Sequence, residues 1–539
     1  MSIDARDHPA DDLETMPEHG TANATEHSGP GHPDAAHMLD IESTSAATGP
    51  ETPPERHRIE GVPANRRMEL VEEPETADPT AEASAYPEPD PSDRVLTNQP
   101  RGPDTAIESN ADPPEIVTAT VPPENSMSSD RDETELRRTA AIDRVCTRYQ
   151  VDSAEARAAV EKAYEVVYEY QAPFIVRHTI DMLEDFKADV AAQPDTVGSF
   201  LGRDGHPIAL AAYALEPELF ESNCTEVTVS RCLADSVVQD LERNGGKNFE
   251  AIEGFRSARA DVDPDDVPGA KAQMTRYLES RGMSVGVPGT TIVLFDSSFK
   301  GTVQELFSAS FPDVDFRGRY LIFGESPDDP HPGSKTGYAL HQSVDRADTD
   351  QDSADLATIF TEKDAVLAIE HVLRGPLSKA VRFDRDDIPV QELESPPLDQ
   401  INPLDVAPDY LDANVRLAVM EANQLAVGHY AESIAAQRRT GGDWHNELTT
   451  KSETFMRQVR SWVTRNSETD PAFAELCDSF VRRTDKNLVG NLRTAIEHRG
   501  LDETDATQVW RDYQQLGSLE DKEAFVVRHT YPSTGASHG

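Results

Sequence analysis

Short apolar runs alternate with longer amphipathic segments through the middle of this 539-residue chain. The strand-like runs are SFL at 199–201, EVTVS at 226–230, TIVLF at 291–295 and RYLIF at 319–323, with a weaker run, AVRF, at 380–383. Strands that alternate with helices are typical of parallel βαβ units, and the unbroken apolar character of TIVLF favours a strand buried on both faces. The pattern predicts an α/β fold, a three-layer domain built on a parallel sheet.

Changes in composition divide the chain into five parts. An acidic, proline-rich tail is predicted at 1–132 and an α/β phosphate-binding domain at 133–395, where apolar positions first recur at helical spacing. A proline-punctuated linker follows at 396–408. Apolar stripes at helical spacing then predict an all-helical domain at 409–516, and 517–539 is predicted to be a flexible tail.

The N-terminal tail is predicted to be disordered because it cannot bury enough apolar surface to offset chain entropy. Residues 1–130 hold 19 of the 38 prolines, no lysine, and Tyr86 as the only aromatic residue. Inside the α/β domain, the segment SPDDPHPGSKTGYALHQSVDRADTDQDSAD is predicted to be a long loop that could cover a site.

Acidic residues outnumber basic residues by 99 to 50, which gives a formal net charge of −49. They are spread along the whole chain, a pattern that favours a halophilic protein kept soluble in concentrated intracellular salt. Direct nucleic-acid binding is not expected, because phosphate contacts need a basic stripe. The acidic tail and the helical domain are candidate regions for a protein partner.

The four cysteines form no CxxC pair and no cluster with metal-ligand spacing, so neither a disulfide framework nor a bound structural metal is predicted. The N-terminus lacks a charged and then apolar signal, and no run approaches the length of a membrane span. A cytoplasmic location is expected.

The first candidate site is the glycine turn that leaves the run SFL and opens a helix. Glycines allow the backbone to approach a ligand, and the free N–H groups of a helix's first turn attract phosphate. Arg203 could pair with phosphate through its fork of donors, and Asp204 could orient that arginine or contact a sugar hydroxyl. Gly205 and His206 would supply further phosphate contacts. The alternative is an ordinary turn stabilised by an Arg–Asp pair.

The second candidate site follows TIVLF and carries the stronger signal. Asp296 stands at the end of this strand, where α/β sheets gather ligand groups. Thr302 and Glu305 have the spacing of a capping box, which predicts a helix that begins at Thr302. The remaining candidate phosphate ligands of this turn are Ser297, Ser298, Lys300 and Gly301.

Arg231 ends the run EVTVS and is a third candidate phosphate ligand. The carboxyl ends of parallel strands share one edge of a sheet, so Arg203, Arg231 and Asp296 are predicted to converge on one crevice. The alternative is that Arg231 is a surface arginine.

These motifs resemble those of type I phosphoribosyltransferases. FLGRDGHPIALAAYAL is similar to their first strand, turn and helix, VTVSR to their second strand, and IVLFDSSFKGT to their phosphoribosyl-pyrophosphate loop. The resemblance implies that the first turn holds pyrophosphate and that the later loop, with two adjacent acids and a Gly-Thr segment, holds the ribose and its 5-phosphate. Asp296 matches the second acid, Phe295 stands in place of the first, and Thr302 comes one residue earlier than in the family.

The order of RDG, SR, D-x-x-x-x-G-T and AIEHVLRGPLSKAVRF also resembles a poorly characterised module. That module accompanies predicted haloacid-dehalogenase-like hydrolases of bacterial surface-polysaccharide loci, and the similarity covers residues 196–383. The catalytic hydrolase domain itself is not evident. Asp384 and Asp386 form a D-x-D pair after a short apolar run, which leaves a phosphatase as one alternative.

Three functions are therefore open. The first is a phosphoribosyltransferase-like or related sugar-phosphate transferase, in which Asp296, Arg203 and Asp204 are the catalytic candidates and a Mg²⁺ ion is the expected cofactor. The second is a non-catalytic protein that binds a nucleotide or sugar phosphate and regulates a partner. The third is a phosphatase that uses Asp384 and Asp386, or Asp296.

Overall fold

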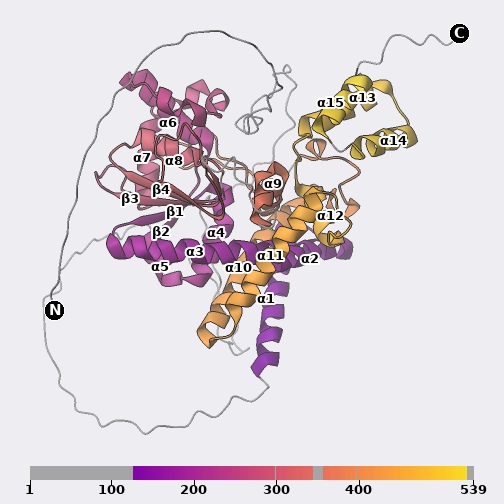
Figure 1. Cartoon of the computed structure of the whole chain (residues 1–539), viewed down its shortest axis with the longest axis horizontal. Coiled ribbons are helices and arrows are strands. Elements are labelled where there is room, and N and C mark those ends of the chain that lie inside the picture. The colour runs from indigo at the N-terminus through magenta and orange to yellow at the C-terminus, as the bar shows by residue number, and fades with distance from the viewer. Residues whose placement is uncertain (1–125, 298, 344–355, 396, 517, 531–539) are drawn as a thin grey trace, which may run out of the picture. The chain divides into compact units, whose positions relative to one another are not determined.

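The computed structural model describes residues 126–297, 299–343, 356–395, 397–516 and 518–530. These ranges contain a five-stranded sheet in which every neighbouring pair is parallel, in the order β2-β1-β3-β4-β5 (Figure 1). The strands are β1 (Val197–Leu201), β2 (Cys224–Val227), β3 (Thr291–Asp296), β4 (Asp315–Gly324) and β5 (Lys335–Gln342). The predicted α/β class and parallel sheet are confirmed.

Two predictions about strands were wrong. Part of the predicted long loop forms β5, an edge strand that pairs with β4. Its side chains are mostly half-buried or exposed, so it lacks the apolar run that marked the inner strands. The run AVRF is not a strand, because Phe383 makes only an isolated antiparallel bridge to Pro389. Residues 344–355 of the predicted loop lie outside the described residues.

Helices cover both faces of the sheet because successive side chains of a strand point to opposite sides. In β3, Ile292 and Leu294 contribute to one apolar core, whereas Val293 and Phe295 contribute to another. The first core includes α6 (Arg231–Gly245), α7 (Ala270–Ser280) and α8 (Thr302–Ser310). The second includes α3 (Gln171–Ala192), α4 (Gly202–Leu215) and α10 (Ala413–Thr440).

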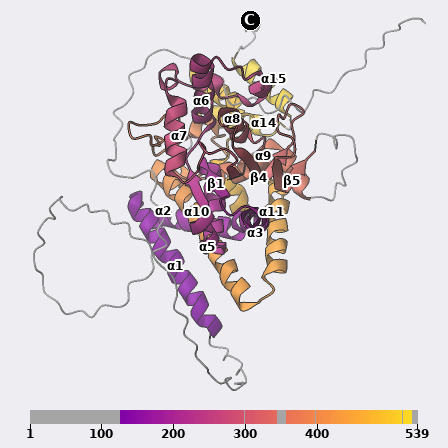
Figure 2. The ribbon, with the colours of Figure 1, turned by 90° about the vertical axis from the view of Figure 1, so that its left-hand side faces the viewer.

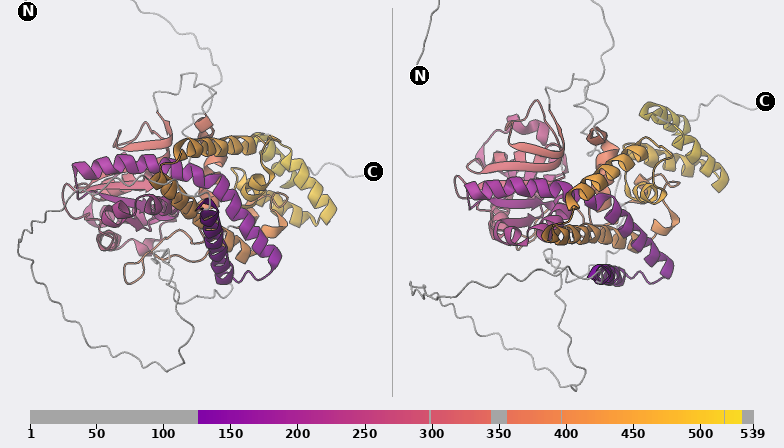
Figure 3. Two further views of the ribbon diagram at one scale, coloured as in Figure 1. Left: turned by 90° about the horizontal axis from the view of Figure 1, so that it is seen from below. Right: turned by 60° about the horizontal axis from the view of Figure 1, so that its bottom comes forward.

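The helices that follow the predicted linker share this second core. Helix α10 contacts α2 (Ala154–Glu169), α3 and α4, and α11 (Trp444–Val463) contacts α3 (Figure 3). Buried residues of α10, α11 and α12 (Pro471–Phe480) therefore belong to the same cluster as those of the sheet. The linker at 396–408 does not separate two independent cores.

The remaining described helices pack mainly against other helices. Helix α1 contacts α2 and α10 (Figure 2), and α13 contacts α15 beside a small cluster of their own that includes Trp510 and Phe525. Their bounds are α1 (Ser126–Arg148), α5 (Pro217–Asn223), α9 (Lys363–Leu373), α13 (Lys486–Arg499), α14 (Glu503–Gln514) and α15 (Leu519–Thr530).

The structure changes two predicted boundaries. Helix α1 begins at Ser126, before the predicted start of order, and the rest of the predicted disordered tail, residues 1–125, lies outside the described residues. Helix α15 occupies residues that were predicted to form a flexible tail. Among the helices that the structure describes, none has the length and apolar character needed to cross a bilayer.

Candidate functional site

Both predicted turns lie where the strand order reverses. The chain passes from β1 to its neighbour β2 and then returns to form β3 on the other side of β1. In sheets with this order, ligands bind outside the carboxyl ends of the strands at this switch point. The turns after β1 and β3 therefore flank the position at which the topology favours a ligand.

Glycines allow the first turn to lie against the end of β3. Gly202 begins α4 with a φ of 53°, a conformation that favours glycine. A Cβ atom at Gly205 would lie 2.9 Å from the carbonyl oxygen of Phe295. The two glycines thus bring the N-terminus of α4 close to the β3 backbone.

Carboxylates from three elements meet beside this helix end. The Ser297 amide donates a hydrogen bond of 2.8 Å to Oδ1 of Asp296, and the Ser297 hydroxyl donates one of 3.3 Å to Oε1 of Glu370 in α9. Burial raises the pKa of Asp296 well above its usual value, and the negative charges of Asp204 and Glu370 raise this pKa further. Asp204 and Asp296, predicted from separate motifs, are therefore electrostatic neighbours.

Arg231 lies close enough to this group to act in the opposite direction. It is an exposed residue at the start of α6, and its positive charge lowers the pKa of Asp296. Ser230 caps the same helix by accepting a hydrogen bond of 3.2 Å from the amide of Leu233. Arg231, which follows the predicted strand EVTVS, thus places a positive charge near the Asp296 carboxylate.

A buried arginine that the sequence motifs did not identify stands next to the first turn. Arg374, the residue that ends α9, is only 4% exposed, and its Nε and Nη2 atoms have no hydrogen-bond partner. Its Nη2 atom forms a long ion pair of 3.8 Å with the partly exposed Glu394 carboxylate. Burial, together with the positive charges of Arg203 and Arg482, lowers the pKa of Arg374 to about 10.

His371 lies among the same cations. Burial lowers its pKa well below the usual value, and the nearby charges of Arg482 and Arg374 act in the same direction. Its Nδ1 atom accepts a hydrogen bond of 3.0 Å from the Arg482 amide, as a neutral imidazole can. His371 is therefore a neutral group beside a positively charged region.

Glu370, His371 and Arg374 were missed for a specific reason. They lie in AIEHVLRGPL, where the sequence offers a resemblance to the poorly characterised module but no motif of known chemistry. Three polar residues at the end of an otherwise apolar, buried helix are the local signal that could have identified them. Their approach to β1 and β3 depends on the position of α9, which local sequence does not reveal.

Several predicted phosphate ligands have other partners. His206 lies in the first turn of α4, and its Nδ1 atom is 2.6 Å from Oε2 of Glu226 in β2. Burial would lower the pKa of His206, but the paired Glu226 carboxylate raises it overall. His206 is thus held by a carboxylate at the sheet edge. Ser298 lies outside the described residues.

Helix α8 begins at Thr302, as predicted, but without the predicted capping box. Gly301 is the N-cap, with a φ of 67° and no side-chain cap hydrogen bond. The Glu305 carboxylate instead pairs with the buried ammonium of Lys335 and lies 2.7 Å from Nδ1 of His331. Glu305 therefore stabilises the packing of α8 against β5 rather than the helix end.

Gly301 also has a packing role. A Cβ atom there would lie 2.8 Å from Cε of Lys335 and 3.0 Å from the hydroxyl oxygen of Tyr320. The preceding residue, Lys300, is half-buried. Because of its close contacts and its positive φ, Gly301 cannot be replaced without disturbing the turn.

The D-x-D pair forms a turn. Oδ1 of Asp384 accepts hydrogen bonds of 2.9 Å from the amides of Asp386 and Ile388. This is the ordinary way in which an aspartate stabilises a tight turn. The Asp384 carboxylate is thus already occupied by the backbone.

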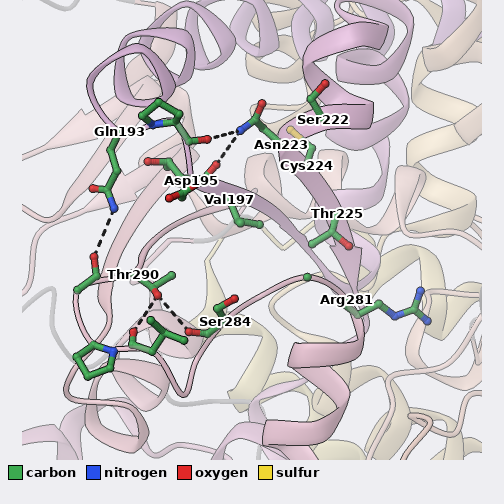
Figure 4. A pocket seen from close by; sticks show the side chains of 16 residues that line it. Gln193, Asp195, Val197, Ser222, Asn223, Cys224, Thr225, Arg281, Ser284 and Thr290 are labelled. Carbon is green, nitrogen blue, oxygen red and sulfur yellow. Dashed lines mark hydrogen bonds between the residues drawn. The ribbon is translucent and has the colours of Figure 1, made fainter. Parts of the chain in front are cut away.

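A pocket of about 570 Å³ lies at the opposite edge of the sheet (Figure 4). It is lined by residues that precede the strands, among them Thr196, Asn223 and Thr290. The Asn223 side chain donates to the carbonyl oxygens of Pro194, at 3.0 Å, and Thr196, at 3.2 Å. This amino-terminal edge is not where doubly wound sheets bind ligands, so we do not take the pocket as the candidate site.

Within the described ranges, no group of three or more His, Cys, Asp or Glu side chains is arranged to hold a metal ion. Comparison with protein-family models, with curated proteins and with solved structures finds no match to this chain.

Proposed function

We propose that this protein binds a sugar phosphate or a nucleotide at the carboxyl edge of β1 and β3, in a three-layer, phosphoribosyltransferase-like fold. The observation that carries the proposal is the close approach of the Gly205 turn to the end of β3, where Asp204 and Arg231 both act on the charge of Asp296. Mixed charge at a switch point suits a ligand that has both hydroxyl and phosphate groups.

Each side of the crevice would recognise a different part of the ligand. The first turns of α4 and α8 offer backbone N–H groups and the positive ends of helix dipoles to phosphate. Arg231 and Arg203 add charged donors. The carboxylates of Asp204 and Asp296 would accept hydrogen bonds from sugar hydroxyls.

The residues also suit Mg²⁺. This ion commonly takes one or two protein carboxylates and completes its coordination with phosphates and water, so a pair such as Asp204 and Asp296 is sufficient. A cation would relieve the repulsion that raises the pKa of Asp296. When bound, Mg²⁺ would neutralise phosphate charge.

Transfer of the phosphosugar is the activity that we propose for this crevice. Phe295 is buried against the ring of Phe200, with centroids 4.6 Å apart, so an acid at this position would face an apolar core. Glu370 lies near Asp296 and would supply the second carboxylate from α9 instead. Arg203, Asp204 and Asp296 would orient the ligand and stabilise charge on the leaving group.

A non-catalytic binding protein is the second candidate, and the apolar Phe295 in place of an acid favours it. The phosphatase hypothesis has less support, because Asp384 already accepts two backbone hydrogen bonds. Both alternatives can be separated from transfer by their products.

Thermal unfolding of the full chain in molar KCl with Mg²⁺ tests the binding. Ribose 5-phosphate, phosphoribosyl pyrophosphate and AMP should each be compared with ribose. A true ligand at a hundred times its Kd should stabilise the protein by about 3 kcal/mol. Arg231→Gln should weaken this effect, whereas Arg385→Gln, an exposed arginine in the D-x-D turn, is the matched control. If no phosphorylated compound stabilises the protein, the proposal is wrong.

Product analysis then distinguishes the candidate activities. Release of pyrophosphate from phosphoribosyl pyrophosphate only when an acceptor base is present would support transfer. Binding without any product would support the non-catalytic protein. Phosphate release from a generic ester, abolished by Asp384→Asn, would support the phosphatase instead.

A further inference from the structure

We propose that the pocket at the amino-terminal edge of the sheet is a second ligand site, which takes an uncharged polyhydroxyl compound such as a mono- or disaccharide. This site goes beyond the proposed function, because the pocket lies at the other end of β1, β2 and β3 from the candidate phosphate site (Figure 4). Its volume of about 570 Å³ is that of an ordinary small-molecule pocket.

Hydrogen bonds between the loops at the starts of the strands fix the walls of the pocket. The Asn223 side chain joins the loop before β2 to the loop before β1. The Gln193 side chain joins the loop before β1 to β3: it donates to the Gly289 carbonyl oxygen, at 3.4 Å, and accepts from the Thr291 hydroxyl, at 3.0 Å. The Gly289 amide in turn donates to the Asp313 carbonyl oxygen, at 2.9 Å. The pocket is therefore formed before any ligand binds.

The pocket carries little charge for a protein of this composition. Charged residues make up 28% of the chain, whose net charge is −49. Two of the 16 lining residues are charged, Asp195 and Arg281, and their charges are opposite. Figure 4 shows these two side chains apart from each other across the pocket. The lining thus has no excess charge that would select a phosphate or a polyamine, and it suits a ligand without net charge.

Hydroxyl and carboxylate groups of the lining are available to a ligand. Within the described residues, the hydroxyls of Ser222, Thr225 and Ser284 form no hydrogen bond, and the Asp195 carboxylate has neither a hydrogen bond nor an ion pair. A hydroxyl can donate and accept, whereas a carboxylate only accepts, and sugar hydroxyls can satisfy both kinds of group. A saccharide would therefore replace water at these groups without breaking a hydrogen bond of the fold.

Apolar side chains of the lining match the other part of a sugar. Val287 is 56% exposed, and Val197, Pro194 and Pro288 also line the pocket. A sugar ring has apolar C–H faces and edges that carry hydroxyls. A lining that mixes aliphatic side chains with hydroxyl and amide groups can therefore contact both parts of the ring.

Isothermal titration calorimetry on the full chain at fixed KCl tests the site. Glucose, sucrose and trehalose are the probes, and ribose 5-phosphate is the comparison. Calorimetry is preferred to thermal unfolding because sugars at high concentration stabilise proteins without binding them. We expect at least one saccharide to bind saturably at millimolar concentration.

Two substitutions place that binding in the pocket. Asp195→Ala removes an exposed acceptor and should weaken saccharide binding about fivefold or more. Ser284→Trp fills the pocket from an exposed position and should abolish binding. Asp152→Ala is the matched control, because Asp152 is an exposed aspartate in the loop between α1 and α2.

The two proposals fail separately. Ser284→Trp should not change ribose 5-phosphate binding, and Arg231→Gln should not change saccharide binding. The inference is wrong if none of the three saccharides binds, or if saccharide binding survives the pocket substitutions in folded protein; should one variant not fold, the other decides. Loss of ribose 5-phosphate binding in folded Ser284→Trp would also overturn it, because the pocket would then be the phosphate site.

Discussion

Two buried arginines of this protein differ sharply in how their charge is satisfied. Arg256 and Arg374 are each 4% exposed. Arg256 donates hydrogen bonds of 3.0 and 2.9 Å to the two carboxylate oxygens of Asp235, and another of 2.6 Å to Glu242. Arg374 has two nitrogen atoms without any hydrogen-bond partner.

The pKa values reflect this difference. Burial would lower the pKa of Arg256, but its hydrogen bonds to Asp235 and Glu242 raise it overall. The pKa of Arg374 is lowered to about 10, because burial and neighbouring cations act together. Breaking a buried, hydrogen-bonded pair such as that of Arg256 is costly, whereas Arg374 has only the long ion pair with Glu394 and keeps nitrogen atoms that could donate to an anion.

Of the substitutions that test this comparison, replacement of Arg256 should change the free energy of unfolding most. Arg256→Gln leaves the fully buried Asp235 carboxylate without its charged partner, although the hydrogen bond from Gln239 remains, so we expect a loss of about 3–5 kcal/mol in unfolding free energy. Equilibrium denaturation in molar KCl measures it. Arg259→Gln, which removes an exposed ion pair to Glu253, should cost less than about 1 kcal/mol. Equal effects of the two substitutions would show that Arg256 is not a structural anchor.

Asp296 is a carboxylate with a raised pKa, so its effect on the free energy of unfolding should depend on pH. Its pKa is raised in the folded state, so ionisation destabilises the fold as the pH rises above the usual aspartate value. Asp296→Asn should therefore be more stable than the wild type at neutral pH, by about 1–2 kcal/mol.

The stability difference should decrease as the pH falls. Below about pH 4, an aspartate is protonated in both the folded and the unfolded states, so the advantage of the asparagine should vanish. Unfolding curves of both proteins across this range, without ligand, provide the measurement. An advantage that does not change with pH would have to come from packing instead.

Replacing Arg374, whose Nε and Nη2 atoms lack hydrogen-bond partners, should have a smaller effect of the opposite sign to Arg256→Gln. Without ligand, Arg374→Gln should leave stability unchanged or raise it by up to about 1 kcal/mol, because it removes an uncompensated buried charge. The same denaturation experiment reports it. A loss comparable to that of Arg256→Gln would mean that Arg374 has internal partners after all.

The smallest effect is expected at the D-x-D turn. Asp384→Asn keeps a side-chain oxygen that can accept the hydrogen bonds of the turn, so its stability should lie within about 0.5 kcal/mol of the wild type. Amide exchange at Asp386 and Ile388 would show whether the turn persists. Faster exchange at both amides would show that the turn needs the charge of a carboxylate.

The strands β1 to β4 were predictable from their sequences, but β5, at one edge of the sheet, was not. β3 is buried on both faces, and its apolar sequence shows this directly. β5 is buried mainly at two positions, one of which is Lys335, whose charge is compensated by Glu305 and Asp329. The burial of Lys335 depends on ion pairs formed in the folded chain, so the residues next to it in sequence do not reveal that this segment is a strand.

The same limit applies to the site. The turns at Asp204 and Asp296 were found because a glycine turn after an apolar strand is a local pattern. Glu370 and Arg374 reach the same edge only through the packing of α9 against α10, which is a property of the folded chain. His206 fits the local pattern, but Glu226, one strand away, binds it.

The late position of α10 has a consequence for synthesis. Helix α10 packs against α2 and α4, yet its first residue, Ala413, leaves the ribosome long after β3 ends at Asp296. At ordinary rates of translation the delay is on the order of ten seconds. During this time the nascent chain exposes apolar surface of α2 and α4 that only α10 covers. The packing of α2 and α4 can therefore be completed only after translation reaches α10.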